Sequence, residues 1–513
     1  MKNIINEIDP IETHSTDASI FKIIPRQVIF PKNELEIIDI ITHAKVNKRH
    51  ISVRAGGTCM DGGSLNNDII INLTKYFTNI KINQYSKSID VDMGVYYRDI
   101  DQEALKYNLM FAPYTSSKVF CGIGGMLGNN ASGEKSIRFG ATVDNVLSAK
   151  VFLSDGKLYN FEEISEEKCL ELSLQNDFIG NIHKEIRQIY KTFANDYVKA
   201  IGNVSKSASG YKLNRIFDKE KNTWNLAKIF IGAQATLGII HSAKLKLVEI
   251  PTHTRLIAIP INSLNSLPVV LQKIVQYNPE SVETFDVNTY TIAKSFLPED
   301  TMRIQKYFSR NEQLIVLAQF DNDDTAQKFF LEIKDIETNS EYINDEEMKA
   351  SLWNIRRSAF RVMGNNVYDK KTKRAVPCIE DIIVPIDKFD VFIPELIAIL
   401  KKYNIEYGFH GHIGDGSIRV IPIIDFENKK EAIDQIINLC DEVFWLVKKM
   451  GGNMSADHSD GIIRTPFLRD FYGDDLYEGV VVGIKKLFDP DNIFNPGKKV
   501  GGDKKGLYEV GLK

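Results

Sequence analysis

The chain carries a glycine-rich stretch between two predicted strands, with the sequence Arg54-Ala55-Gly56-Gly57-Thr58-Cys59-Met60-Asp61-Gly62-Gly63-Ser64. Glycine lacks the Cβ atom that would block a close approach, so paired glycines let the backbone pass near a bulky anion and point successive N–H groups at it. The stretch therefore predicts a loop that binds a diphosphate. The other interpretation is a long turn without a ligand.

The sequence on either side of this loop predicts alternating strands and helices. Residues 27–30 and 50–54 have strand patterns. The segment between them predicts a helix that begins after Asn33, with Glu36 completing its N-terminal cap. Residues 27–54 therefore predict one βαβ unit. Residues 68–73 and 88–93 predict two more strands.

Length and composition place the chain among ordinary globular proteins. Its 513 residues are enough for two or three domains, and its 43% hydrophobic and 26% charged residues are typical of such proteins. The net charge of -4 argues against nucleic acid as the main partner. The five cysteines form no Cys-x-x-Cys pair, which argues against an iron–sulfur cluster in this chain.

The sequence also indicates where the protein resides. Residues 1–7 include an acid and no apolar run, so we expect no signal peptide. No apolar run approaches the ~18 residues needed to span a bilayer, so we expect no transmembrane segment. These features predict a cytoplasmic protein, with a peripheral position at the inner membrane as the alternative.

A second glycine-rich stretch has the sequence Gly122-Ile123-Gly124-Gly125-Met126-Leu127-Gly128-Asn129-Asn130-Ala131-Ser132-Gly133. Its glycine spacing, with Asp144 further on, partly resembles a dinucleotide fingerprint. A nicotinamide site needs a long helix after the glycines, whereas residues 129–133 are rich in helix breakers, so we reject that site. We expect little regular helix here and a loop that binds a flat isoalloxazine ring or a phosphate.

Several motifs together resemble one family of flavoproteins. The first loop and four later motifs resemble the FAD domain of the vanillyl-alcohol-oxidase (PCMH) type: Pro113-Tyr114-Thr115-Ser116, Ile123-Gly124-Gly125-Met126, Ser154-Asp155-Gly156 and Thr236-Leu237-Gly238-Ile239-Ile240. Three motifs resemble the branch with D-lactate dehydrogenase, glycolate oxidase and D-2-hydroxyglutarate dehydrogenase: His412-Ile413-Gly414-Asp415-Gly416-Ser417, Asp457-His458, and Phe488-Asp489-Pro490 with Asn495-Pro496-Gly497. The resemblance covers residues 20–500 in the family's order.

The resemblance implies an α+β fold, with α/β elements in the N-terminal part. We expect a two-subdomain FAD-binding domain of the PCMH type over residues 20–250. A substrate-binding cap domain, with an antiparallel sheet flanked by helices, is expected over residues 251–450. Residues 451–513 are expected to return to the FAD domain and complete the active site.

The resemblance also implies that FAD is the cofactor. The first loop contains no histidine, so we expect non-covalent binding, with Cys59 as a small buried filler. The residues expected to bind FAD are Arg54, Gly56, Gly57, Thr58, Gly62, Gly63, Ser64, Pro113, Thr115, Gly124, Gly125, Asn129, Ser132, Gly133, Thr236, Gly238, Ile239, Ile240 and Asn495.

The implied chemistry is the oxidation of a 2-hydroxy acid, which needs a base for the hydroxyl proton and a cation for the carboxylate. His458 is the candidate base, because imidazole titrates closest to neutral pH. Arg356, in a Trp-x-x-Arg segment that resembles the family's, is the candidate clamp for the substrate carboxylate. Its neighbour Arg357 is expected to be exposed. The alternative for His458 and Arg356 is a purely structural role.

The sequence departs from the family pattern at an expected metal site. The branch reads His-x-Gly-Asp-Gly-Asn-x-His and Glu-His, and this chain has His412, Arg419 and Asp457 at the three ligand positions. A guanidinium cannot coordinate a metal ion and repels it, so we expect a doubtful metal site, held by His412 and Asp457 if at all. Arg419 is then expected to hold the substrate oxyanion or carboxylate, with His412 beside it. The alternative is that Arg419 pairs with Asp415 or Asp457 in an inactive site.

Neighbouring residues leave further options open. Glu380 and Asp381 are candidates for replacement carboxylates. His410, two residues before His412, is expected on the opposite face of its strand.

The leading hypothesis is an FAD-dependent dehydrogenase that oxidises a small D-2-hydroxy acid to the 2-keto acid, with hydride transfer to flavin N5. D-lactate is the first candidate for this substrate. Without cysteines for an iron–sulfur cluster, we expect the electrons to go to an external acceptor such as a quinone, a cytochrome or an electron-transfer flavoprotein. One alternative is a non-redox flavoenzyme of the alkylglycerone-phosphate synthase type. Another is a FAD-binding subunit with an impaired active site.

Overall fold

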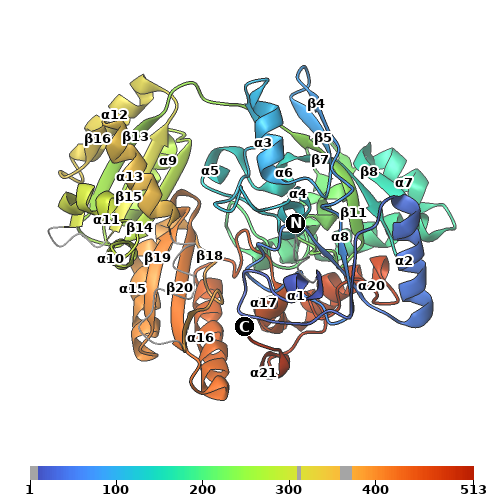
Figure 1. Cartoon of the computed structure of the whole chain (residues 1–513). Coiled ribbons are helices and arrows are strands. Elements are labelled where there is room, and N and C mark those ends of the chain that lie inside the picture. The colour runs from blue at the N-terminus through green and yellow to red at the C-terminus, as the bar shows by residue number, and fades with distance from the viewer. Residues whose placement is uncertain (1–9, 309–313, 359–371) are drawn as a thin grey trace, which may run out of the picture.

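The computed structural model describes residues 10–308, 314–358 and 372–513, and Figure 1 shows that they form two lobes. One lobe contains the N-terminal half of the chain together with its C-terminal end, and the other contains the segment between them. Residues 1–7, on which the expected absence of a signal peptide rests, lie outside the described residues. Among the helices of the described ranges, none has the length and apolar character needed to cross a membrane.

A small parallel sheet carries the first glycine-rich loop. Its strands are β1 (Gln27–Ile29), β2 (Ile51–Arg54) and β3 (Ile69–Asn72), in the order β1-β3-β2, and the loop joins β2 to β3. Helix α2 (Glu34–Asn47) starts as predicted, because the Asn33 side chain accepts a hydrogen bond from the Glu36 N–H at 3.0 Å. The predicted elements of the βαβ unit are confirmed. However, β3 lies between β1 and β2, so the two predicted strands are not neighbours.

A seven-stranded antiparallel sheet forms the larger sheet of the same lobe. Its order is β4-β5-β11-β7-β8-β10-β9, so β11 returns from far along the chain to lie between β5 and β7. The strands are β4 (Ile80–Asn83), β5 (Ser88–Asp92), β7 (Val146–Phe152), β8 (Leu158–Ser165), β9 (Phe217–Asp218), β10 (Thr223–Asn225) and β11 (Ile239–Lys246). A separate two-stranded ladder pairs β6 (Leu109–Met110) with β12 (Val248–Glu249).

An eight-stranded antiparallel sheet forms the centre of the second lobe, with seven strands in the order β16-β13-β15-β14-β19-β20-β17 and β18 beside β20. Alternate side chains enter two buried clusters: Ile257 packs with α9 and α12 residues, and Leu256 with α10 and α13 residues. The expected antiparallel sheet flanked by helices is therefore confirmed. The strands are β13 (Arg255–Ile261), β14 (Ser281–Asp286), β15 (Leu314–Phe320), β16 (Glu341–Ile343), β17 (Lys373–Ala375), β18 (Ile382–Ile383), β19 (Glu406–Gly411) and β20 (Ser417–Asp425).

Helices cover these sheets and fill the space between them (Figure 1). In the N-terminal half they are α1 (Pro10–His14), α3 (Tyr97–Leu105), α4 (Ile123–Asn129), α5 (Ser136–Phe139), α6 (Thr142–Asn145), α7 (Glu166–Ser173) and α8 (Phe178–Ile201). In the second lobe they are α9 (Leu267–Gln276), α10 (Val287–Ala293), α11 (Pro298–Arg303), α12 (Asp323–Lys334), α13 (Glu346–Arg357), α15 (Phe389–Lys402) and α16 (Lys429–Lys449). The C-terminal helices are α17 (Gly461–Arg464), α18 (Leu468–Tyr472), α19 (Asp474–Leu476), α20 (Gly483–Phe488) and α21 (Gly506–Glu509).

The second glycine-rich stretch contains a helix, which corrects the expectation of little regular structure there. Helix α4 is rich in glycine, a poor helix former, but its apolar side chains Ile123, Met126 and Leu127 are buried in the core. Tertiary packing thus outweighs the local propensity. The helix is seven residues long and ends before Asn130, so the helix breakers do stop it and the nicotinamide-type fingerprint stays rejected.

The end of the chain packs back onto the small parallel sheet. The Ile51 N–H donates to the Ile493 carbonyl at 2.7 Å, and the Asn495 N–H donates to the Ile51 carbonyl at 2.7 Å. The Asn495 side chain then donates to the carbonyls of Gly63 and Gln234, at 2.8 and 2.7 Å. Asn495, near the C-terminal end of the chain, therefore holds the first glycine-rich loop against the turn that precedes β11.

Candidate active site

One cleft brings together the glycine-rich segments and the charged residues of the second lobe. It encloses about 1570 Å³ of space between atoms, including the part open to solvent. The predicted catalytic residues Arg356, His412, Arg419 and His458 all line it. So do many predicted FAD-binding residues: Arg54, Gly56, Gly57, Thr58, Gly63, Ser64, Thr115, Gly124, Gly125, Asn129, Ser132, Gly238 and Ile240.

The other predicted FAD-binding residues do not line the cleft: Gly62, Pro113, Gly133, Thr236, Ile239 and Asn495. Ile239 is buried in the core, because successive side chains of β11 point to opposite faces and Ile240 takes the cleft side. The Thr236 hydroxyl donates to the Ala233 carbonyl at 2.7 Å. Cys59, expected as a buried filler, instead lines the cleft and is half-buried.

The first loop presents unused backbone donors. Gly57 has a φ of 71°, a left-handed conformation that glycine adopts without strain. Across the described ranges, the backbone N–H groups of Gly57, Thr58 and Cys59 have no hydrogen-bond partner. Successive unpaired N–H groups in a half-buried loop form the donor set that a phosphate accepts. The loop therefore fits the diphosphate of FAD.

Gln234 and Ala235 are two of the cleft residues that the sequence reasoning missed. Gln234 and Ala235 have φ values of 52° and 55°, so the backbone turns sharply just before β11. The Gln234 side chain donates to Asp61 at 2.7 Å and accepts the Gly461 N–H at 2.8 Å. It thereby links the first loop to the C-terminal segment. No local sequence pattern marks these contacts, since their partners lie far away along the chain.

His410 also lines the cleft, which corrects its expected placement on the opposite strand face. Side chains alternate along a strand, so residues two positions apart share a face, and His410 and His412 both point to the cleft side. The His410 ring forms no hydrogen bond within the part of the chain that the structure describes. The same alternation, applied correctly, would have predicted it.

Arg419 lies at the centre of the charged end of the cleft. The β19–β20 hairpin carries it, with a turn at Gly416 whose φ is 82°. Its Nη2 lies 2.9 Å from both carboxylate oxygens of Asp457 and 3.2 Å from Nε2 of His412. Its Nη1 lies 2.9 Å from Nε2 of His458. The guanidinium therefore contacts all three side chains at once.

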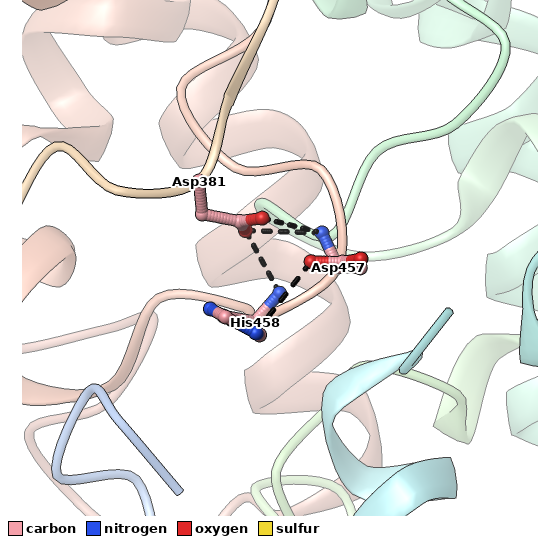
Figure 2. A group of neighbouring side chains, drawn as sticks. All are labelled: Asp381, Asp457 and His458. Atoms are coloured by element: carbon pink, nitrogen blue, oxygen red, sulfur yellow. Dashed lines mark hydrogen bonds and ion pairs between the residues drawn. The ribbon is translucent and has the colours of Figure 1, made fainter. Parts of the chain in front are cut away.

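His458 is oriented by two carboxylates. Its Nδ1 lies 2.8 Å from Glu380, whose other oxygen pairs with the buried Arg464. Asp381 accepts the backbone N–H groups of His458 and Asp457, at 2.8 and 3.0 Å, and so fixes the turn that carries both side chains (Figure 2). Glu380 and Asp381, which were candidates for replacement carboxylates, are thus engaged in holding His458.

The charges around His458 raise its proton affinity. Burial and the Arg419 guanidinium lower the pKa of His458, but the carboxylates of Asp381, Asp457 and Glu380 raise it by more, so the net shift is upward. An imidazole whose pKa is raised is a stronger base.

Arg356 reaches the cleft from the last turn of α13. It is buried and pairs with Glu283 of β14, which also contacts Nδ1 of His412 at 2.6 Å. The Nε–H of Arg356 is buried and has no partner among the described residues. Arg357 is exposed, as expected, and donates to Glu134 at 2.8 Å. An unpaired guanidinium donor is available for an anion at Arg356.

Lys206 is a further cation that the sequence reasoning missed. Its Nζ lies 2.8 Å from the Ser132 hydroxyl, 3.2 Å from Asp415 and 3.8 Å from Asp457. Asp415 therefore pairs with Lys206, and Arg419 pairs with Asp457, which was one of the two partners considered for it.

The donor set does not fit a divalent metal ion. The Arg419 guanidinium lies between His412, Asp457 and His458, whose nitrogen and oxygen atoms would be the ligands. Asp381, Asp457 and His458 also offer atoms within 4.8 Å of one another. Those atoms already contact donors of this chain: the backbone for Asp381 and Arg419 for the other two.

Two protein-family models match the chain. A FAD binding domain matches residues 25–162, and the C-terminal domain of FAD linked oxidases matches residues 250–499. The chain belongs to the FAD-linked oxidases. Its cofactor is therefore FAD, and the resemblance of the motifs to this family is confirmed.

Curated relatives in the family carry the names that the motifs suggested. D-2-hydroxyglutarate dehydrogenase of Haemophilus influenzae is 29% identical over 94% of this chain and 49% of its own length. D-lactate dehydrogenase of Anaerostipes hadrus is 23% identical over 96% of this chain and 93% of its own length. The chain thus spans about half the length of the first of these relatives.

Two solved structures share the fold. A 4-ethylphenol oxidase from Gulosibacter chungangensis matches with a TM-score of 0.66 at 14% identity, covering 96% of this chain and 92% of its own. An alkyldihydroxyacetonephosphate synthase matches with a TM-score of 0.65 at 14% identity, covering 95% of this chain and 81% of its own. At this identity the likeness shows the fold alone.

Substitution of Gly56 by alanine is expected to remove FAD. A Cβ at this position would lie 2.1 Å from the Phe120 carbonyl oxygen, so the two glycine-rich segments would have to separate. We expect purified Gly56→Ala protein to carry far less than one flavin per chain by absorbance. The matched control is Gly506→Ala, where the nearest atom would lie 3.5 Å away. A fully loaded Gly56→Ala protein would contradict the role given to this loop.

Proposed function

We propose that this chain is an FAD-dependent dehydrogenase that oxidises a small D-2-hydroxy acid, with D-lactate as the first candidate, to the 2-keto acid. The observation that carries the proposal is that Arg356, Arg419 and His458 line the same cleft as the glycine-rich loops. The names of the relatives, which are dehydrogenases of 2-hydroxy acids, support it.

Arg356 binds the substrate carboxylate. Its guanidinium is held by the buried Glu283, and its buried Nε–H has no partner within the described ranges. A planar guanidinium suits two parallel hydrogen bonds to a carboxylate, which fixes the orientation of the substrate as well as binding it. Glu283 also holds His412, so the two residues keep a fixed relative position.

His458 takes the hydroxyl proton. Its Nε2 accepts a hydrogen bond from Arg419, and the substrate hydroxyl takes the place of this bond. The proton moves to Nε2, and Glu380 stabilises the imidazolium through Nδ1–H. Arg419 then donates to the substrate oxygen, whose negative charge grows as the proton leaves.

The carbon that bears the hydroxyl loses a hydride as the oxygen loses its proton, so it is oxidised by two electrons to a ketone. Bound FAD supplies the flavin ring that takes up this hydride at N5. The two electrons leave the chain to an external acceptor, a quinone, a cytochrome or an electron-transfer flavoprotein.

D-2-hydroxyglutarate is the second candidate substrate. The relatives named D-2-hydroxyglutarate dehydrogenase have the higher identities, up to 29%, against 23% for the D-lactate dehydrogenase of Anaerostipes hadrus. A second carboxylate needs a second cation, and Arg357 lines the cleft beside Arg356.

Anaerobic mixing of the FAD-loaded protein with a panel of D- and L-2-hydroxy acids tests the proposal. Bleaching of the flavin absorbance by D-lactate or by D-2-hydroxyglutarate, and not by their L-enantiomers, is the expected result. Comparison of the two D-acids decides between the candidates. A flavin that no 2-hydroxy acid reduces would overturn the proposal and would favour a non-redox flavoenzyme or a FAD-binding subunit with an impaired site.

A further inference from the structure

The Arg419 guanidinium is enclosed by side chains of the types that commonly bind metal ions. Two imidazole Nε2 atoms and a carboxylate surround the guanidinium, at 2.9 to 3.2 Å. Histidine and aspartate are common ligands of divalent ions. Here two histidines and an aspartate contact the two terminal nitrogens of one guanidinium, a side chain of the protein itself.

The hydrogen bonds assign the same tautomer to both imidazoles. Nδ1 of His412 contacts Glu283 at 2.6 Å, and Nδ1 of His458 contacts Glu380 at 2.8 Å. A guanidinium only donates hydrogen bonds, so each Nε2 that contacts Arg419 keeps a lone pair and each Nδ1 carries the proton that it donates to its carboxylate. Both lone pairs then accept from Arg419. Carboxylate–imidazole pairs of this kind orient the ligands of metal sites.

The charge at this point is permanent. A guanidinium has no acceptor atom and keeps its proton at any physiological pH, so it cannot change into a ligand. Lys206 lies 3.8 Å from Asp457 and adds a second positive charge beside the same carboxylate. A divalent ion placed among these ligands would lie next to both cations.

We propose that Arg419 is a built-in replacement for a divalent metal ion: its guanidinium occupies the ion's place between His412, Asp457 and His458 and supplies the positive charge that holds the substrate's anionic oxygen. The carboxylates Glu283 and Glu380 keep the imidazoles in the tautomer that a metal site uses, but their lone pairs now receive N–H groups. The role toward the substrate rests on the proposed function, whereas the exclusion of metal does not.

Metal counting on the FAD-loaded protein tests the proposal. The wild-type chain, incubated with Zn²⁺ or Mn²⁺ and then desalted, is expected to retain far less than one ion per chain by mass spectrometry of the metal. Arg419→His removes the cation and adds a third imidazole, so this variant is expected to retain about one ion per chain. Arg419→Lys keeps the charge without the guanidinium shape and is expected to retain as little as the wild type.

Three results would overturn the proposal: one ion per wild-type chain, an Arg419→His protein that retains none, or an Arg419→Lys protein that retains as much as Arg419→His. Flavin absorbance and thermal unfolding verify that each variant is folded and loaded. If Arg419→His does not fold, the wild-type and lysine counts still decide. Failure of the proposed function has a different signature, because the metal counts do not depend on whether any 2-hydroxy acid reduces the flavin.

Discussion

Replacement of His458 by alanine is expected to leave FAD bound and to slow the reduction of the flavin by substrate by ~10²–10⁴-fold, the range for a lost general base. The ring lines the charged end of the cleft, and its Nδ1 is held by Glu380. Anaerobic stopped-flow absorbance, started by mixing with the 2-hydroxy acid that bleaches the wild type, measures the rate.

The matched control is His43→Ala, since His43 is exposed on α2, away from the cleft. The flavin of this variant is expected to be reduced by the substrate at the wild-type rate. A His458→Ala protein with full flavin content and wild-type reduction kinetics would remove His458 from the mechanism. Loss of FAD from this variant would instead assign it a role in cofactor binding.

Substitution of Arg356 by glutamine is expected to lower kcat/KM for the substrate by ~10²–10⁴-fold with little change in flavin content. Each charge-assisted hydrogen bond contributes about 1.5–3 kcal/mol, so two of them to one carboxylate account for a loss of this size. Steady-state kinetics with an artificial electron acceptor measure it. The loss is expected mainly in KM, because the carboxylate is bound in the ground state as well.

This substitution also leaves Glu283 buried without its cation, and breaking a buried pair costs about 3–5 kcal/mol of stability. Arg356→Lys keeps the charge and is therefore the variant to use if the glutamine protein does not fold. Arg357→Gln, beside it, removes an exposed arginine and is expected to change kcat/KM for D-lactate much less. Equal effects at the two positions would contradict the clamp.

The sequence was sufficient for elements whose signals are local. The cap of α2, the strands around residues 51–54 and 69–72, and the loop between them follow from patterns within a few residues. The insertion of β3 between β1 and β2 does not, because strand order is set by contacts between distant segments. Helix α4 was missed for the same reason: its glycines argue against a helix, and only the core that it packs against stabilises one.

In the candidate site, too, residues within sequence motifs could be predicted, whereas their distant partners could not. His412, Arg419, Asp457 and His458 could be named because they occupy positions in recognisable motifs. Their partners could not: Glu283 carries no motif, yet it contacts His412 across a separation of 129 residues. The tautomers and the central position of Arg419 depend on these partners and required the folded chain.

The side chain of Asn495 ties the first glycine-rich loop to the turn before β11, with hydrogen bonds to Gly63 and Gln234. During translation the first glycine-rich loop is made early, whereas Asn495 is among the last residues to leave the ribosome. We therefore expect flavin to bind only after the C-terminal segment has been made. A chain that stops before residue 495 is expected to lack flavin even though every glycine of the loop is present.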